Sequence, residues 1–243
     1  MLTLYWKEIR GFFSSVTGYL VIAVFLTLNG LFLWAFPGEF NILENGYAGL
    51  DGLFMLAPFV FMFLIPAITM RLLSDEIRTG TIELLFTKPL SDWGIILAKY
   101  LAGCTLVFLS LLPTLVYVYS VYQLGATPGN LDTGGTAGSY IGLLFLGFSY
   151  TAIGVFASSL TDNQIIAFLA ALFLCFIWYM GFESISTFSW LGSLDYYIQS
   201  IGISAHYSSM SRGVIDLRDM LYFLTLSAFF LSLTVLKLQS RKW

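Results

Sequence analysis

Six long apolar stretches, separated by short polar or glycine-containing segments, dominate the hydrophobic pattern of the chain. Each is about as long as a helix needs to cross a bilayer, roughly 20 residues at about 1.5 Å per residue. Backbone groups in lipid must be hydrogen-bonded within the protein, which favours helices over isolated strands. The pattern therefore predicts an all-α, polytopic membrane protein with six transmembrane helices, at residues 19–36, 53–73, 92–124, 140–160, 165–182 and 220–236.

Prolines, glycines and one tight turn shape these predicted spans. Pro58 and Pro66 in the second span and Pro113 in the third remove intrahelical hydrogen bonds, so bends are expected there. Residues 125–139 are rich in glycine and predict a flexible outer loop. Residues 161–164 leave room only for a turn, which makes the fifth span antiparallel to the fourth.

Composition agrees with this pattern and excludes a soluble globular domain. Of 243 residues, 58% are hydrophobic and only 10% are charged, whereas soluble domains carry about 25% charged residues. The mean hydropathy is +0.84. Cys104 and Cys175 both lie inside apolar runs, so neither a disulfide nor a metal site is predicted. We expect contact with the lipid bilayer and no nucleic-acid partner.

The distribution of basic residues predicts the orientation of the chain. Nine of the eleven lysines and arginines lie before the first span, within residues 71–99, or after the last span. Only Arg212 and Arg218 lie on the opposite side. Because cytoplasmic segments of membrane proteins are enriched in lysine and arginine, both termini and residues 71–99 are predicted to face the cytoplasm.

Residues 1–243 are expected to form one transmembrane domain. Two of its segments outside the spans are expected to lie at the membrane surface. Residues 1–17 mix aromatic and basic side chains, which is typical of an interfacial helix. No small-x-small cleavage site follows the first span, so that span is expected to be retained. Residues 184–218 are rich in serine and aromatic side chains and predict an extracytoplasmic loop with one or two short helices. Glu183 can reach water at the end of the fifth span, and no role is expected for it.

The long polar interruption in the first half of the chain is residues 74–90, SDEIRTGTIELLFTKPL. Thr81 can cap a short helix there, with Glu83 in the first turn, where the helix dipole favours negative charge. Pro89 would end that helix. One face of the helix holds three apolar residues, Ile82, Leu85 and Phe86. A helix of about two turns is too short to be stable alone, so it is expected to pack against the membrane surface or a partner protein.

Small residues recur at helical spacing on one face of the fourth span, at Gly147, Thr151, Gly154 and Ser158. Small side chains in this arrangement let another helix approach closely. Packing within the bundle is the favoured interpretation, and contact with a second copy of the chain is the alternative.

Residues Glu76 to Leu85, followed by Pro89-Leu90 and then Lys99, resemble the E-x-x-x-G-T-x-E-x-L…P-L…K signature of ABC-2 type transporter permeases. The resemblance implies that residues 74–90 form a cytoplasmic coupling helix that docks on a separate ABC ATPase subunit. It further implies two permease subunits, as a homodimer or heterodimer, and two ATPases. The residues that it assigns to ATPase coupling are Glu76, Arg78, Gly80, Thr81, Ile82, Glu83, Leu85, Phe86 and Pro89. The plain alternative is an ordinary charged loop.

Residues 7–20 and 206–219 are also similar to bacterial permeases associated with gliding motility. This resemblance implies a location in the bacterial inner membrane and a role in export or in the gliding-motility machinery.

The energy source is expected to lie on another chain. The sequence contains no G-x-x-x-x-G-K-[ST] phosphate-binding loop, so ATP is expected to bind to the partner ATPase, and the permease is expected to be neither an enzyme nor a cofactor-binding protein. One alternative is mechanical relay of ATPase work to a periplasmic or membrane partner without transport. A more remote alternative is an intramembrane serine hydrolase that pairs Ser149 with His206, although these two residues are expected at different depths.

Overall fold

The structure is a computed structural model that describes residues 1–44, 46–86, 91–125, 129–187 and 195–240. Within these ranges every regular element is a helix, which confirms the all-α prediction. Six helical stretches are long and apolar enough to cross a membrane, and they match the six predicted spans: Val16–Ala35, Asp51–Arg78, Asp92–Leu124, Thr133–Leu160, Gln164–Ser186 and Leu217–Gln239.

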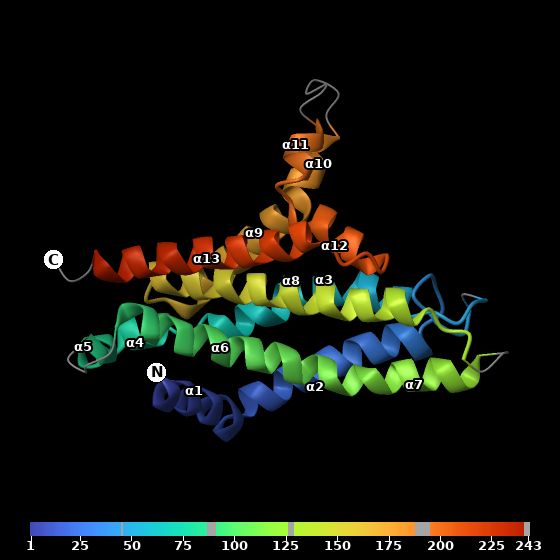
Figure 1. Ribbon diagram of the computed structural model, residues 1–243. Coiled ribbons are helices and arrows are strands. Elements are labelled where there is room, and N and C mark those ends of the chain that lie inside the picture. Colours follow the sequence, from blue (N-terminus) through green and yellow to red (C-terminus); the bar gives the residue numbers. More distant parts are fainter. Residues whose placement is uncertain (45, 87–90, 126–128, 188–194, 241–243) are drawn as a thin grey trace.

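Short breaks and changes of helix type divide these stretches into smaller elements (Figure 1). In chain order the elements are α1 Leu2–Ser14, α2 Val16–Gly30, η1 Leu31–Ala35, α3 Asp51–Thr69, α4 Ser74–Arg78, α5 Thr81–Phe86, α6 Asp92–Leu111, η2 Leu112–Thr114, α7 Leu115–Leu124, α8 Thr133–Leu160, α9 Gln164–Phe176, η3 Ile177–Gly181, α10 Phe182–Ser186, α11 Asp195–Gln199, α12 Ile203–Ser211 and α13 Leu217–Gln239. The 3-10 turn η2 contains Pro113, where a bend was predicted. Helices α11 and α12 are the short helices predicted within residues 184–218.

Helix α8 lies at the centre of the bundle, where it packs against α3, α6, α9, α12 and α13. It is the most deeply buried of the six candidate spans, whereas the spans built on α2 and α9 are the most exposed. Figure 1 shows α1, α4, α5 and the C-terminal end of α13 at one end of the bundle, which we call the α5 end. Helix α12 lies toward the opposite end, the α12 end, and α10 and α11 project away from the bundle.

Residues 133–139 belong to α8, although the glycine-rich segment 125–139 was predicted to be a flexible loop, so the prediction is corrected over this part. The Asp132 side chain accepts a hydrogen bond from the Gly135 N–H at 3.0 Å and caps α8, so the helix begins earlier than the predicted residue 140. A Cβ at Gly138 would lie 2.7 Å from the carbonyl oxygen of Met210. The glycine therefore allows α12 to pack closely on α8, a role that composition alone does not distinguish from loop flexibility.

Side-chain caps also set the start of two spans at the α5 end. The Ser91 hydroxyl accepts a hydrogen bond from the Gly94 N–H at 3.1 Å and caps α6. Asn163 accepts one from the Ile165 N–H at 2.9 Å and starts α9 directly after the tight turn. Helix α9 also contacts α4.

Candidate functional site

The 74–90 segment begins where α3 ends and the chain turns at the α5 end. The hydroxyl oxygen of Ser158 in α8 accepts hydrogen bonds from the backbone N–H groups of Leu73 and Ser74, both at 3.0 Å. The same hydroxyl donates to the carbonyl oxygen of Met70 at 3.0 Å. N–H groups at a helix start have no partner within the helix. Ser158 therefore supplies the missing acceptor and fixes the start of α4.

Helix α4 is also joined to the start of α9. Asp75 Oδ1 accepts hydrogen bonds from Gln164 Nε2 at 2.9 Å and from the Arg78 guanidinium at 2.7 Å. The Asp75–Arg78 ion pair is largely exposed, and such pairs contribute little to stability. The Gln164 contact has a different consequence, because it connects α4 to the turn between the fourth and fifth spans.

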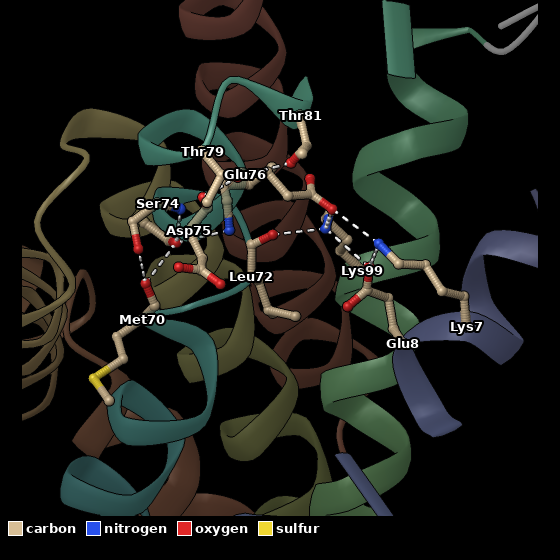
Figure 2. A network of polar contacts seen from close by, with 12 residues as sticks. Lys7, Glu8, Met70, Leu72, Ser74, Asp75, Glu76, Thr79, Thr81 and Lys99 are labelled. Atoms are coloured by element: carbon tan, nitrogen blue, oxygen red, sulfur yellow. Dashed lines mark hydrogen bonds and ion pairs between the residues drawn. The ribbon is translucent and has the colours of Figure 1, made fainter. Parts of the chain in front are cut away.

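Lys99 of α6 lies at the centre of an ion network beside α4 (Figure 2). Its side chain is only 1% exposed, and its Nζ lies 3.0 Å from Glu8 Oε1 and 2.8 Å from Glu76 Oε1. Nζ also donates to the carbonyl oxygen of Leu72 at 2.6 Å. A lysine ammonium has three protons, and each has an acceptor here. Helices α1, α4 and α6 and the turn after α3 therefore meet at one buried positive charge.

Lys7 of α1 completes this network at its exposed edge. Its Nζ lies 3.1 Å from Glu76 Oε1 and 3.4 Å from Glu8 Oε1, so two lysines balance two carboxylates. Burial lowers the pKa of Lys7, but the Glu8 and Glu76 carboxylates raise it by more, so the pKa lies above its ordinary value and Lys7 stays charged. We call Lys7, Glu8, Glu76 and Lys99 the Lys99 network.

Beyond the Lys99 network, the segment presents a polar surface. Arg78, Thr79, Gly80, Thr81 and Glu83 are all exposed. Gly80 has φ +69°, a backbone conformation that favours glycine. Thr81 is the first residue of α5, one position inside the predicted cap, and its hydroxyl lies 3.0 Å from that of Thr79.

Two residues that were expected to face the ATPase are engaged within the chain itself. Ile82 is only 6% exposed and belongs to the hydrophobic core, so its side chain packs within the chain, and its role in ATPase coupling stays a prediction. Glu76 is held by Lys99 and Lys7. The helical pattern identified an apolar face but carried no information about what that face packs against. Pro89 and the side chains of Leu85 and Phe86 lie outside the described residues.

The small residues of the fourth span contact two neighbouring helices of the same chain. The contacts are Gly154 with Thr69 of α3, Gly147 with Val107 of α6, and Thr151 with Gly103 of α6. At Gly147 a Cβ would lie 2.5 Å from Val107 Cγ1, so a larger residue would force the helices apart. Together with Ser158 at the turn, this face of α8 holds α3 and α6 in place within the bundle.

Ser149 and His206 do not form the dyad that a serine hydrolase would need. The Ser149 hydroxyl lies 3.3 Å from that of Ser227 and 3.4 Å from the carbonyl oxygen of Phe223. His206 Nδ1 lies 2.7 Å from Asp219 Oδ1, and its Nε2 lies 2.9 Å from the carbonyl oxygen of Ser200. Both ring nitrogens of His206 therefore have other partners.

Sequence reasoning missed the partners of Lys99. It placed Lys99 in the signature but did not connect it with Glu8, which lies in α1, 91 positions earlier in the sequence. A usable signal existed, because an ionisable side chain at the edge of an apolar span needs a counter-charge or hydrogen-bond partner. The signal does not say which of the acidic residues near the α5 end supplies it.

Comparison with known families agrees with this architecture. A family model described as ABC-2 family transporter protein matches residues 2–236. No curated protein matches the chain. Because the family match covers nearly the whole chain and includes all six apolar helices, the chain is a multi-pass membrane protein that belongs to the ABC-2 transporter family.

Proposed function

We propose that the chain is the permease subunit of an ABC transporter and that a separate ATPase chain docks on the 74–90 segment from the cytoplasm. Membership of the family supports a membrane component of such a transporter. The sequence has no phosphate-binding loop, which supports an ATPase on another chain. The observation that carries the proposal is the Lys99 network, because it links the exposed polar surface to two other helices.

The contacts indicate how displacement of the segment would reach the bundle. An ATPase shifts the permease only if its nucleotide states contact the segment differently. Arg78, Thr79 and Glu83 offer exposed polar groups for that contact. Movement of α4 would then act on α6 through Glu76 and on α1 through the shared Lys99.

The same proposal includes the orientation and assembly of the complex. Nine of the eleven basic residues come, in sequence, before the first span, within residues 71–99 or after the last span, which supports a cytoplasmic location for the α5 end and for both termini. The assembly would be two permease subunits, identical or related, with two ATPases in a bacterial inner membrane. Association with gliding motility stays a prediction from the similarity of residues 7–20 and 206–219.

Site-directed labelling tests both the orientation and the docking surface. Cys104 and Cys175 are buried, so a new exposed cysteine would dominate reaction with a membrane-impermeant maleimide. We expect Thr79→Cys to react only from the cytoplasmic side and to crosslink to the co-expressed ATPase. The matched control, Ser184→Cys, lies on an exposed part of α10 and should react only from the outside. Labelling of Thr79→Cys from the outside would overturn the proposal.

Mechanical relay without transport is a second candidate, favoured by the way α10 and α11 project from the bundle (Figure 1). Such a projection could contact an extracytoplasmic partner. Reconstituted vesicles separate the two candidates. Export predicts ATP-dependent movement of a compound between compartments, whereas relay predicts ATP hydrolysis stimulated by the partner with no net movement.

A further inference from the structure

A groove of about 710 Å³ lies between α1 and α6, with one residue of α8 at its edge. Its apolar lining includes Leu2 and Trp6 of α1, Leu101, Cys104 and Phe108 of α6, and Phe148 of α8. Leu2 is 71% exposed, Trp6 51%, Leu101 41% and Phe108 45%, so the groove is open to its surroundings. The stretch from Leu101 to Phe108 extends for roughly 10 Å along α6, a length suited to a flexible apolar chain.

The two hydroxyl groups in the groove are already satisfied. Tyr5 OH and Thr105 Oγ1 lie 2.8 Å apart, and Thr105 Oγ1 also donates to the carbonyl oxygen of Leu101 at 2.8 Å. The tyrosine hydroxyl is then the donor in the first bond, so neither proton is left without an acceptor. Neither hydroxyl proton is therefore free to bind an occupant, and the rest of the lining that α6 and α8 supply is apolar.

A basic hollow adjoins the apolar groove. It is lined by Thr3, Lys7 and Arg10 and shares Leu2 and Trp6 with the groove. The side chain of Arg10 is exposed and makes no hydrogen bond or ion pair with any residue that the structure describes. Lys7 is already held by Glu76, so Arg10 is the available cation at this position. One continuous surface on α1 therefore combines an apolar groove with a positive charge.

We propose that an anionic phospholipid of the surrounding bilayer binds here, with one acyl chain in the groove and its phosphate at Arg10. The apolar groove matches the acyl chain of such a lipid, and the cation matches its phosphate. Each basic residue near the membrane surface strengthens the binding of anionic lipids. Trp6, which lies between the two parts, suits the boundary between headgroups and hydrocarbon. A second copy of the chain is the alternative occupant of the apolar groove, and the experiments below distinguish it from a lipid.

The bound lipid would support the contact between α1 and α6. Its acyl chain lies against the same pair of helices that the Tyr5–Thr105 hydrogen bond and the Glu8–Lys99 ion pair join. The inference does not depend on the ATPase, because it concerns the permease chain alone. Its failure and the failure of the proposed function are therefore separate outcomes.

Lipid titration of the purified full chain in detergent, followed by native mass spectrometry, tests the charge requirement. The probes are phosphatidylglycerol and phosphatidylcholine with identical acyl chains. We expect phosphatidylglycerol to bind more tightly, and Arg10→Gln to weaken its binding about fivefold while leaving phosphatidylcholine unchanged. The matched control is Arg218→Gln, an exposed basic residue at the α12 end, which should change neither affinity. Equal binding of both lipids by the wild-type chain, or an unchanged affinity in Arg10→Gln, would overturn the proposal.

A second pair of variants tests the groove. Leu101→Trp should fill it and reduce binding of both lipids, whereas Leu224→Trp, at another exposed leucine on a span, should not. If Leu101→Trp changed the proportion of dimer but left lipid binding unchanged, the groove would be a contact between copies and the proposal would be wrong. If Leu101→Trp did not fold, quenching of tryptophan fluorescence by a brominated phosphatidylglycerol would test the site instead. Its acyl chain should quench wild-type fluorescence more strongly than that of Trp6→Phe, and equal quenching counts against the site.

Discussion

Each end of the bundle carries a polar cluster of low exposure, yet the two clusters hold together different kinds of structure. At the α5 end Lys99 joins Glu8 of α1, Glu76 of α4 and the carbonyl oxygen of Leu72 in the turn before α4, so it connects parts of the chain that are distant in sequence. At the α12 end His206 joins Asp219 and the carbonyl oxygen of Ser200, and its ring stacks on Tyr222 with the centroids 3.9 Å apart. That second cluster lies entirely within residues 200–222.

The difference shows what each end can do. A network among distant helices passes a displacement of one helix to the others, whereas a cluster within one stretch of chain fixes only the local arrangement of α12 and α13. The central side chains differ as well. A lysine ammonium donates through three protons, whereas a neutral imidazole donates through one ring nitrogen and accepts through the other. We therefore expect coupling to depend on the α5 end and to be insensitive to the α12 end.

The largest effect is expected for Lys99→Met. Removing the lysine leaves the Glu8 and Glu76 carboxylates close together and largely buried, and loss of one member of a buried ion network costs about 3–5 kcal/mol. The free energy of unfolding in mixed micelles measures this change. Replacing Glu8 and Glu76 by glutamine in the same chain is the control, and it should restore most of the loss because no buried charge remains unpaired and the Lys7 side chain, which is 62% exposed, reaches solvent. A cost that persists in the triple variant would assign the effect to packing.

A smaller effect is expected for His206→Phe. Phenylalanine keeps the stacking on Tyr222 but removes both hydrogen bonds, so the free energy of unfolding should fall by about 1.5–3 kcal/mol. ATPase activity of the assembled complex should stay normal because the residue lies away from the α5 end. Loss of coupling in this variant would break the distinction between the two ends.

The effect of Gly80→Ala on stability is expected to be smaller than that of His206→Phe. The φ of +69° at this position costs a residue with a Cβ about 1–2 kcal/mol, although nothing lies within 4 Å of the added atom. The α4–α5 corner should therefore shift, with a partial loss of ATPase coupling in reconstituted vesicles. Gly11→Ala is the matched control, since that glycine lies inside α1 with free space around it and should tolerate alanine. Equal coupling in both variants would argue against a strict geometry at Gly80.

The smallest change in stability is expected for Glu83→Lys. The residue is exposed, so the free energy of unfolding should stay within about 0.5 kcal/mol of the wild type. Reversal of its charge should nevertheless reduce co-purification with the ATPase. Arg218→Glu, a charge reversal at the α12 end, should leave co-purification intact. Normal assembly of Glu83→Lys would remove this residue from the docking surface.

Some features of the site could be predicted and others could not, for identifiable reasons. The short helix after Gly80 followed from the local order of polar and apolar residues. Burial of Ile82 did not follow, because its neighbours in space come from other helices. Gly138 was assigned to a loop since glycine promotes both flexibility and close helix packing, and only the position of Met210 decides between them.

By itself the sequence determined that the chain forms six apolar helices, because span length and hydrophobicity are properties of each segment alone. The tertiary structure alone decided that Glu8, Glu76 and Lys99 meet, and that Ser158 fixes the start of α4. A buried charge or an unpaired N–H group requires a partner, but its chemistry does not say which distant residue provides one. That choice depends on how the helices pack, since small residues such as Gly147 and Gly154 set how closely α8 approaches its neighbours.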